Sequence, residues 1–380
     1  MSDNMMTRKE FITRLGGGIV GIVTASFWMA ACSQSAPLKY KHWVWITTDL
    51  KTTAEEWSRQ FARMRQAGIT AVLPEVFDSR RAYYGSSHLP VGAEWLETIL
   101  PLAKKEGLEV HAWIWIMPCN IPAIQTRHPE WYMVNGVRES ALDKPAYVDY
   151  YKFLCPSREE VQEFLQQRIR ELGAYSELDG IHLDYIRYTD VIIAPALQPK
   201  YQVVQDREYP EFDYCYCSVC RAKFKAISGK DPLALKNPSE DNEWRQFRYD
   251  SITRLVNDKL VPLARQAGKQ ITAAVFPNWE AVRQQWMVWD LDGFMPMLYH
   301  NFYNADLEWI KEQVRAQVAA LKNRAPLYSG LFVPELPPNK LRRALRLSIK
   351  NGAAGVSLFH AAALDESSWE VLARVTHSRL

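Results

Sequence analysis

The sequence has little excess of charge of either sign. It therefore lacks the strong positive charge that would favour a nucleic-acid partner. Lysine and arginine total 46 and aspartate and glutamate total 43, so the formal net charge of the 380 residues is +3. No basic tract with interleaved aromatic residues is present, although nucleic-acid-binding chains typically carry one. We therefore expect no nucleic-acid partner.

Two motifs of cofactor and metal chemistry are also missing. No glycine-rich phosphate loop follows the first predicted strand, Trp43–Thr48, which weighs against nucleotide binding. No His-x-His pair follows that strand and no histidine cluster lies at the other strand ends, so metal-dependent hydrolysis is disfavoured. We expect no cofactor to be required for catalysis.

The N-terminal segment has no apolar run long enough for a comfortable membrane span. Thr7–Thr13 is basic and resembles a twin-arginine signal in which Lys9 replaces the second arginine. The apolar stretch Leu15–Met29 that follows is short and glycine-rich for a transmembrane helix. It leads into Met29-Ala-Ala-Cys32, which resembles a bacterial lipobox with methionine where leucine is usual.

These features predict an exported lipoprotein of the bacterial cell envelope, periplasmic or anchored to the outer membrane. Residues 1–31 would be the signal peptide, Cys32 the lipidated residue that places a lipid anchor in the membrane, and residues 32–39 a polar tether. The alternative is an ordinary cleaved signal in which Cys32 has no special role.

Residues 40–380 contain apolar, β-rich runs that alternate with amphipathic helical stretches, as in a parallel sheet. The predicted strands are Trp43–Thr48, Ile69–Val76, Leu108–Ile116, Gly180–Ile186, Ile271–Phe276, Gly293–Leu298, Leu327–Phe332 and Gly355–Phe359. The predicted helices are Ala54–Ala67, Glu94–Lys105, Arg158–Leu172, Glu243–Gln266, Leu307–Leu321 and Lys340–Lys350. This number of strand–helix units predicts an α/β fold. It favours closure into a (β/α)8 TIM barrel over an open doubly wound sheet.

The fourth predicted strand carries polar residues on one face. In Asp179–Tyr188, Ile181 and Leu183 would face the helices, whereas His182 and Asp184 would face the barrel mouth. An ionised carboxylate in a dry core is costly without a partner, so a substrate-filled mouth would explain Asp184. The alternative is a structural carboxylate held by Arg187.

In a TIM barrel the functional groups lie at the C-terminal strand ends. Carboxylates, arginines and tryptophans gather at these positions, and the chain holds 14 tryptophans and 18 tyrosines, which suit stacking on sugar rings. We therefore expect a carbohydrate substrate. The expected substrate-binding residues are Asp49, Trp115, Asn120, His182, Tyr185, Arg187, Asn278, Trp279, Tyr299, His300 and His360.

Several segments in order resemble one known family. They are Ala71–Phe77, Ala82–Pro90, His128–Trp131, Leu154–Ser157, Asp179–Tyr188, Asp292–Tyr299 and Gly352–Phe359. Residues from about 40 to 370 are similar to family 10 of the glycosyl-hydrolase-like proteins, bacterial barrels related to the α-amylase superfamily and long catalogued as a domain of unknown function. The resemblance implies a TIM barrel, hydrolysis of O-glycosidic bonds, and Asp184 as the nucleophile at the end of strand four.

A glycosidase also needs a second carboxyl group as the general acid. The candidates are Glu75, between apolar neighbours on the second strand, and Glu280, which lies in the loop after the fifth strand. Glu75 is favoured because burial would raise its pKa, as an acid requires. Its alternative role is an ion pair with Arg80, Arg81 or Arg187.

A long insertion, residues 189–242, follows the fourth strand and contains Cys215, Cys217 and Cys220. Three thiols within six residues suggest a structural zinc site, with Cys155, Cys119, Asp213 or water as fourth ligand. The alternative is a disulfide plus a free thiol, as expected outside the cytoplasm.

Two classes of function therefore remain open: a glycoside hydrolase that acts on a poly- or oligosaccharide, and a catalytically inactive surface lipoprotein that binds carbohydrate on the same fold.

Overall fold

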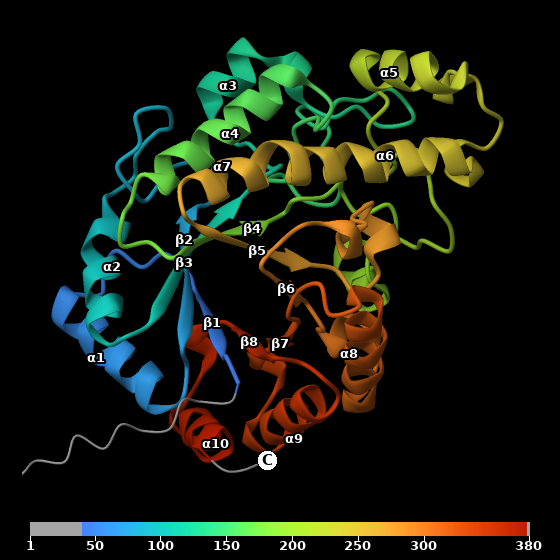
Figure 1. Cartoon of the computed structure of the whole chain (residues 1–380). Helices are drawn as coiled ribbons and strands as arrows, with labels where there is room; N and C mark the ends of the chain where they lie inside the picture. Colours follow the sequence, from blue (N-terminus) through green and yellow to red (C-terminus); the bar gives the residue numbers. More distant parts are fainter. Residues whose placement is uncertain (1–39, 378–380) are drawn as a thin grey trace, which may run out of the picture. The chain divides into compact units, whose positions relative to one another are not determined.

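The computed structural model describes residues 40–377, in which eight parallel strands form a barrel with helices on its outside (Figure 1). The strands are β1 Trp43–Ile46, β2 Ala71–Phe77, β3 Glu109–Trp115, β4 Gly180–Asp184, β5 Gln270–Val275, β6 Gly293–Pro296, β7 Tyr328–Phe332 and β8 Gly355–Phe359. Each predicted strand is present, with ends that differ by up to two residues. The proposed signal peptide, lipobox and tether lie outside the described residues.

The strand order is β6-β5-β4-β3-β2-β1-β8-β7, and the sheet closes where β7 meets β6. That junction consists of isolated parallel bridges, Phe294 with Leu327 and Met297 with Gly330. The backbones approach closely here, because a Cβ on Gly330 would lie 2.5 Å from the carbonyl oxygen of Pro296. The parallel pairing and closure confirm the TIM-type barrel.

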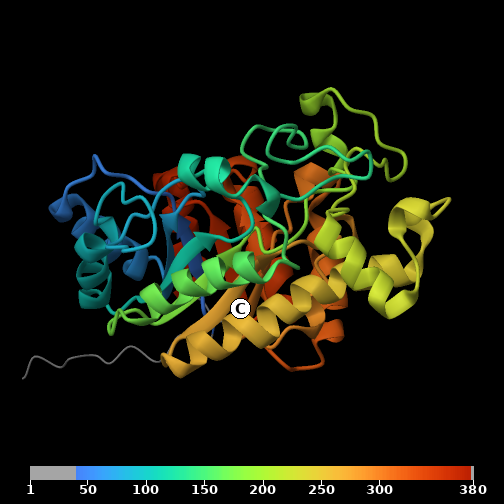
Figure 2. The same ribbon diagram turned by 90° about the horizontal axis from the view of Figure 1, so that it is seen from above.

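Most of the helices follow the strands and cover their outer face (Figures 1 and 2). The main helices are α1 Ala54–Gln66, α2 Trp95–Lys105, α3 Pro122–Arg127, α4 Glu159–Gly173, α5 Ser218–Ser228, α6 Asn242–Arg254, α7 Val261–Gln266, α8 Leu307–Leu321, α9 Pro338–Lys350 and α10 Glu366–His377. Helix α5 lies farther out than the others and packs against α6. Among residues 40–377, no helix has the length and apolar character that crossing a membrane requires.

The helix predicted over Glu243–Gln266 is divided in the structure. A π-helical turn, Leu255–Leu260, separates α6 from α7. Pro262 lies in the first turn of α7 and has no backbone N–H to donate to the preceding turn, so a wider turn takes the place of regular α-helix. The predictions also omitted α10, whose buried residues Trp369, Leu372 and Val375 recur every three positions.

The barrel interior is filled by large aromatic and aliphatic side chains. It contains Trp43, Trp45, Ala71, Leu73, Trp113, Ala274, Met295 and Tyr328. Polar groups in this interior bond to one another: Thr272 Oγ1 lies 2.9 Å from Nδ1 of His182 and 3.2 Å from Nδ1 of His111. The interior is therefore a packed core beneath the barrel mouth.

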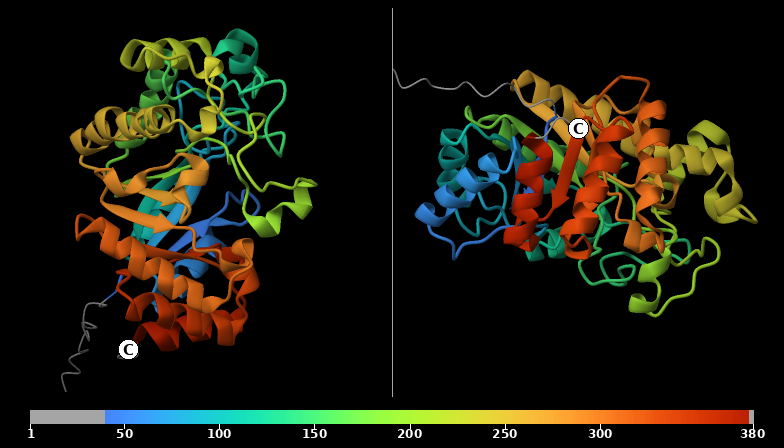
Figure 3. Two further views of the ribbon diagram at one scale, coloured as in Figure 1. Left: turned by 90° about the vertical axis from the view of Figure 1, so that its right-hand side faces the viewer. Right: turned by 90° about the horizontal axis from the view of Figure 1, so that it is seen from below.

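The segment between β4 and α6 is the longest connection between a strand and the next long helix. It contains α5 and short 3-10 turns, among them Pro195–Leu197 and Pro199–Tyr201. Figures 2 and 3 show this segment, coloured green to yellow, at the periphery of the barrel. Its first part borders the pocket described below.

Candidate active site

A pocket of about 360 Å³ lies at the C-terminal ends of the strands. Its volume falls in the range of small-ligand sites. It is lined by Thr47, Glu75, Trp113, Trp115, Tyr150, Tyr151, Asp184, Tyr185, Arg187, Asp190, Ile193, Ala194, Leu197, Lys200, Tyr201, Phe276, Met297, Tyr299, Phe302, Tyr303, Phe332 and Phe359. Aromatic rings form most of the wall, and a few charged groups converge within it.

Asp184 is the last residue of β4, where the strand delivers its carboxylate into the pocket. Its Oδ2 accepts a hydrogen bond of 3.0 Å from the indole nitrogen of Trp113, and its Oδ1 accepts one of 2.7 Å from the backbone N–H of Tyr185. Tyr185 has φ of 51°, an uncommon conformation for a residue with a side chain. Such strained positions gather at functional sites.

Burial raises the pKa of the Asp184 carboxyl to about 6, although the hydrogen bonds from Tyr185 and Trp113 and the charge of Arg187 oppose the rise. Desolvation penalises the charged form, while donors aimed at the carboxylate favour it. Asp184 is therefore ionised above about pH 6.

Glu75 lies near the end of β2 and also lines the pocket. Burial raises the pKa of its carboxyl to about 7, and the negative charges of Asp78 and Asp184 add to the rise against opposing interactions with Thr48 and Trp115. The hydroxyl of Thr48 donates a hydrogen bond of 2.7 Å to the backbone carbonyl of Glu75, which fixes the strand end. Glu75 thus holds its proton to a higher pH than Asp184.

The two carboxyl groups come from strands on either side of β3. In the parallel registers, Glu75 is opposite Trp113 and Asp184 is opposite Trp115. The two tryptophans are on the same face of β3, because side chains alternate along a strand. Burial raises the pKa of both carboxyl groups, and the higher value at Glu75 suits it to be a general acid beside an ionised Asp184.

Arg187 does not hold Asp184. Its guanidinium forms a buried ion pair of 3.0 Å with Asp190 and donates a hydrogen bond of 3.2 Å to the hydroxyl of Tyr151. The ring of Phe276 lies 4.6 Å from the guanidinium. Arg187 therefore fixes the aromatic wall, and the alternative reading in which it clamps Asp184 or Glu75 is wrong.

Six of the predicted site residues line this pocket. They are Glu75, Trp115, Asp184, Tyr185, Arg187 and Tyr299. The other predicted residues lie outside its lining: Asp49, Asn120, His182, Asn278, Trp279, Glu280, His300 and His360.

Glu280 is exposed in the turn Trp279–Val282, beyond the end of β5. Because this turn begins directly after Asn278, the side chain of Glu280 is carried away from the end of β5. Trp279 packs edge-on against Tyr249 at 5.1 Å, and Asn278 accepts a hydrogen bond of 2.7 Å from the hydroxyl of Tyr303. Asn278 thus acts on the pocket through Tyr303.

His182 was expected at the mouth but lies deeper in the barrel. Its Nε2 accepts a hydrogen bond of 3.2 Å from the indole of Trp45, so its Nδ1 carries the proton and donates to Thr272. Burial lowers the pKa of this imidazole well below its usual value. Both ring nitrogens are occupied by protein partners, and we correct the substrate-binding assignment to an interior structural role.

The remaining predicted residues have local partners. Asp49 accepts hydrogen bonds from the backbone of Lys51 and the hydroxyl of Thr52. Asn120 donates a hydrogen bond of 3.0 Å to the backbone carbonyl of Tyr150, which supports the pocket wall. His300 is buried in the turn His300–Tyr303, and the ring of His360 packs against Phe359.

Sequence reasoning missed several residues of the wall. Trp113 was detectable, because it is two positions before Trp115 and so shares its face of the strand. Tyr150, Tyr151, Asp190 and Tyr201 come from long loops without periodicity, where no sequence pattern indicates which side chains turn inward.

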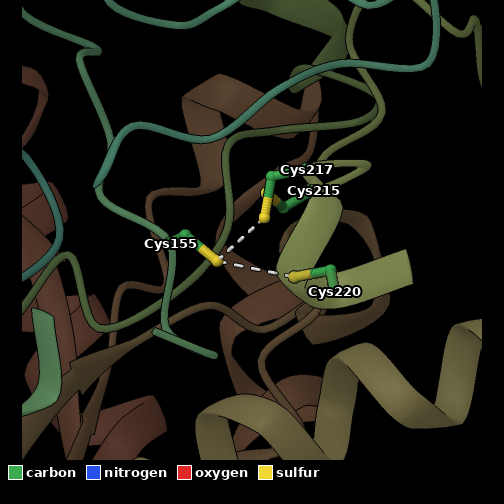
Figure 4. Close-up of side chains that lie close together, drawn as sticks. All are labelled: Cys155, Cys215, Cys217 and Cys220. Atoms are coloured by element: carbon green, nitrogen blue, oxygen red, sulfur yellow. Dashed lines mark hydrogen bonds between the residues drawn. The ribbon is translucent and has the colours of Figure 1, made fainter. Parts of the chain in front are cut away.

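Four buried cysteines form a second cluster, away from the pocket lining (Figure 4). The Sγ atoms of Cys155, Cys215, Cys217 and Cys220 all lie within 4.8 Å of one another. Of the expected candidates for a fourth member, Cys155 is the one in the cluster. Cys119 is buried elsewhere, and Asp213 pairs with Arg248 and Arg283.

Comparisons of the fold with solved structures find TIM-barrel glycosidases. The catalytic domain of β-amylase from Paenibacillus polymyxa is similar with a TM-score of 0.61 at 11% identity, over 88% of this chain and 95% of that one. The β-galactosidase from Rahnella sp. R3 has a TM-score of 0.62 at 13% identity, over 89% of this chain and 55% of that one. The α-L-fucosidase isoenzyme 2 from Paenibacillus thiaminolyticus has a TM-score of 0.56 at 14% identity, over 89% of this chain and 49% of that one.

At these identities the likeness is one of fold, and the chain spans about half the length of the galactosidase and fucosidase chains. No curated protein matches the sequence. The family model described as Glycosyl hydrolase-like 10 matches residues 43–324, which include Glu75 and Asp184. The chain therefore belongs to the glycosyl hydrolase-like 10 family.

Proposed function

We propose that the protein hydrolyses O-glycosidic bonds of a poly- or oligosaccharide, with Glu75 as general acid and Asp184 as the ionised partner. The observation that carries this proposal is the pair of pocket carboxyl groups whose pKa values are raised to about 7 for Glu75 and about 6 for Asp184. Glycosidases need one protonated and one ionised carboxyl group on either side of the scissile bond.

In this proposal Glu75 donates its proton to the glycosidic oxygen as the bond to the leaving group breaks. Asp184 either attacks the anomeric carbon or removes a proton from the attacking water. The donors from Trp113 and Tyr185 keep Asp184 ionised and aim its oxygens. The positive charge that develops on the sugar ring is stabilised by the nearby carboxylate.

The pocket wall supports a carbohydrate as the bound molecule. Trp115 and Tyr185 lie with ring centroids 4.5 Å apart, and the ring of Tyr150 lies 5.7 Å from Trp115. Flat aromatic faces of this kind contact the apolar faces of sugar rings, while the exposed Lys200 supplies a charged group to the pocket lining.

The test is reducing-sugar release from a panel of bacterial and plant polysaccharides by residues 33–380. The parent is compared with Asp184→Asn, Glu75→Gln and the control Glu280→Gln. We expect release by the parent and the control and a loss of at least about 10³-fold in Asp184→Asn. Unchanged turnover in Asp184→Asn would refute the mechanism. If the parent and all three variants bind a glycan but none of them releases reducing sugar, the alternative function, a catalytically inactive carbohydrate-binding protein, would be favoured.

We further propose that the protein is an exported lipoprotein attached through Cys32, as the lipobox-like sequence indicates. Cells fed radiolabelled palmitate should label the parent and not Cys32→Ala. Equal labelling of both would refute lipidation at this residue.

A further inference from the structure

The four-cysteine cluster joins two loops that are distant in sequence. Cys155 lies in the loop between β3 and α4, whereas Cys215, Cys217 and Cys220 lie between β4 and α6. The Sγ atom of Cys155 is 3.6 Å from that of Cys217 and 3.4 Å from that of Cys220, across 62 and 65 residues (Figure 4). Figure 4 shows these sulfur atoms pointing toward a common centre.

The sulfur spacing fits a tetrahedral metal and not a pair of disulfides. With Zn–S bonds of about 2.3 Å, the edge of a ZnS4 tetrahedron is about 3.8 Å. The S···S distances from Cys155 are 3.4 and 3.6 Å, slightly below this edge. All four sulfur atoms lie within 4.8 Å of one another, so the whole set is close to the size of the tetrahedron. A disulfide would need about 2.05 Å, and either of these pairs would have to close by more than about 1 Å.

The surroundings of the cluster suit thiolate ligands. The backbone N–H of Val134 donates to Sγ of Cys215 at 3.5 Å, and Cys217 is the N-cap residue of the eleven-residue helix α5. Helix N-termini stabilise thiolates. Tyr188 is a neighbour of the cluster: its buried hydroxyl has no hydrogen-bond partner among residues 40–377, and negative charge on Cys155, Cys215 or Cys220 would raise its pKa further.

We propose that Cys155, Cys215, Cys217 and Cys220 bind one Zn²⁺ ion through four thiolates. Four protein ligands complete the tetrahedral shell and leave no open position for water, so the site is structural and takes no part in the hydrolysis. Each thiol that becomes a ligand releases its proton, which makes zinc affinity increase with pH.

The zinc ion cross-links the two loops that form one side of the pocket. The β3–α4 loop supplies Tyr150 and Tyr151 to the wall, and the β4–α6 segment supplies Asp190, Ile193 and Tyr201. These side chains keep their relative positions when their loops are joined at a fixed point. Loss of zinc should therefore weaken substrate binding more than it slows the chemical step.

The decisive measurement is the metal content of the purified full-length protein, prepared without chelator and determined by inductively coupled plasma mass spectrometry. We expect about one zinc per chain in the parent and in Cys119→Ser, a matched control that removes a buried thiol outside the cluster. Cys215→Ser and Cys220→Ser should retain less than about a tenth of it. Because the readout is metal content, it is independent of whether the protein cleaves glycans.

A second measurement covers the case in which the cysteine variants fail to fold. Zinc in the parent is replaced by Co²⁺, which should give the intense visible and near-ultraviolet bands of tetrahedral thiolate coordination. Alkylation of the denatured, unreduced parent should label all six cysteines when Cys32 is unmodified. Protection of the four cluster cysteines as disulfides, or a parent without zinc and without cobalt bands, would overturn the proposal.

Discussion

The indole nitrogen of Trp113 donates a hydrogen bond of 3.0 Å to Oδ2 of Asp184. This donor favours the ionised carboxylate and so lowers the pKa of Asp184 against the effect of burial. Because Trp113 belongs to β3 and Asp184 to β4, the contact also ties the carboxylate to the neighbouring strand. The protonation state of the proposed nucleophile or base thus depends on a side chain that performs no proton transfer.

Removal of this donor should move the acidic limb of the activity profile. In Trp113→Phe the pKa of Asp184 should rise by about one unit, because a hydrogen bond to the charged form is lost while burial remains. The activity at pH 6 should fall more than the activity at pH 8, as measured by kcat/KM against pH. Trp45→Phe is the control, since it removes an interior indole that donates to His182 instead. An equal shift of the acidic limb in Trp113→Phe and Trp45→Phe would contradict a specific effect of the Trp113 hydrogen bond on the pKa of Asp184.

The parent enzyme should have a narrow bell-shaped pH profile. Activity requires Asp184 ionised and Glu75 protonated, and their pKa values of about 6 and about 7 place the maximum between these two values. The two limbs of the pH profile give apparent pKa values that belong to the interacting pair and not to either carboxyl group alone. The profile of kcat/KM on a soluble oligosaccharide tests this, and a plateau that extends above pH 9 would exclude Glu75 as the acid.

The raised pKa of Glu75 predicts a gain in stability on its neutralisation. A carboxyl whose pKa is higher in the folded state, here about 7, destabilises the fold as pH rises from about 4 through 7. Glu75→Gln should therefore increase the free energy of unfolding by about 1–3 kcal/mol at pH 8 and by little at pH 4. Denaturant unfolding at both pH values tests this, with the exposed Glu280→Gln as control. A loss of stability at pH 8 would contradict it.

The buried ion pair of Arg187 and Asp190 should be far more sensitive than an exposed one. Asp190→Ala leaves the guanidinium of Arg187 buried without its partner, at a cost of about 3–5 kcal/mol. Glu370→Ala, which breaks the exposed helical pair with Arg374, should cost less than about 0.5 kcal/mol. Urea unfolding of the two variants makes the comparison, and equal costs would show that solvent reaches Arg187.

The sequence was sufficient for the barrel, and two of its three candidate catalytic carboxyl groups, Glu75 and Asp184, line the pocket. Apolar runs of strand length identified every strand, and polar residues at the ends of otherwise apolar strands identified Glu75 and Asp184. The loop-borne wall was not predictable, because Tyr150, Tyr151 and Tyr201 follow no periodicity. Position at a strand end was also insufficient by itself: Glu280 is turned to solvent and His182 is one strand step too deep.

The cysteine cluster shows the same limit. The spacing of Cys215, Cys217 and Cys220 suggested a metal site, with a disulfide as the alternative, from local sequence alone. The choice between Cys155 and Cys119 as the fourth member depended on how the β3–α4 loop folds back, which is a tertiary property. Both thiols are buried, so burial did not distinguish them.

The junction of β6 and β7 also bears on aggregation. Hydrogen-bonded ladders join the other neighbouring strands, whereas this pair is joined by two isolated bridges, whose bonds include those from the N–H groups of Phe294 and Leu298. If these few bonds break, the ring becomes an open sheet with two exposed edges. Unpaired strand edges recruit other chains. The close backbone approach that Gly330 permits therefore keeps these two strand edges paired.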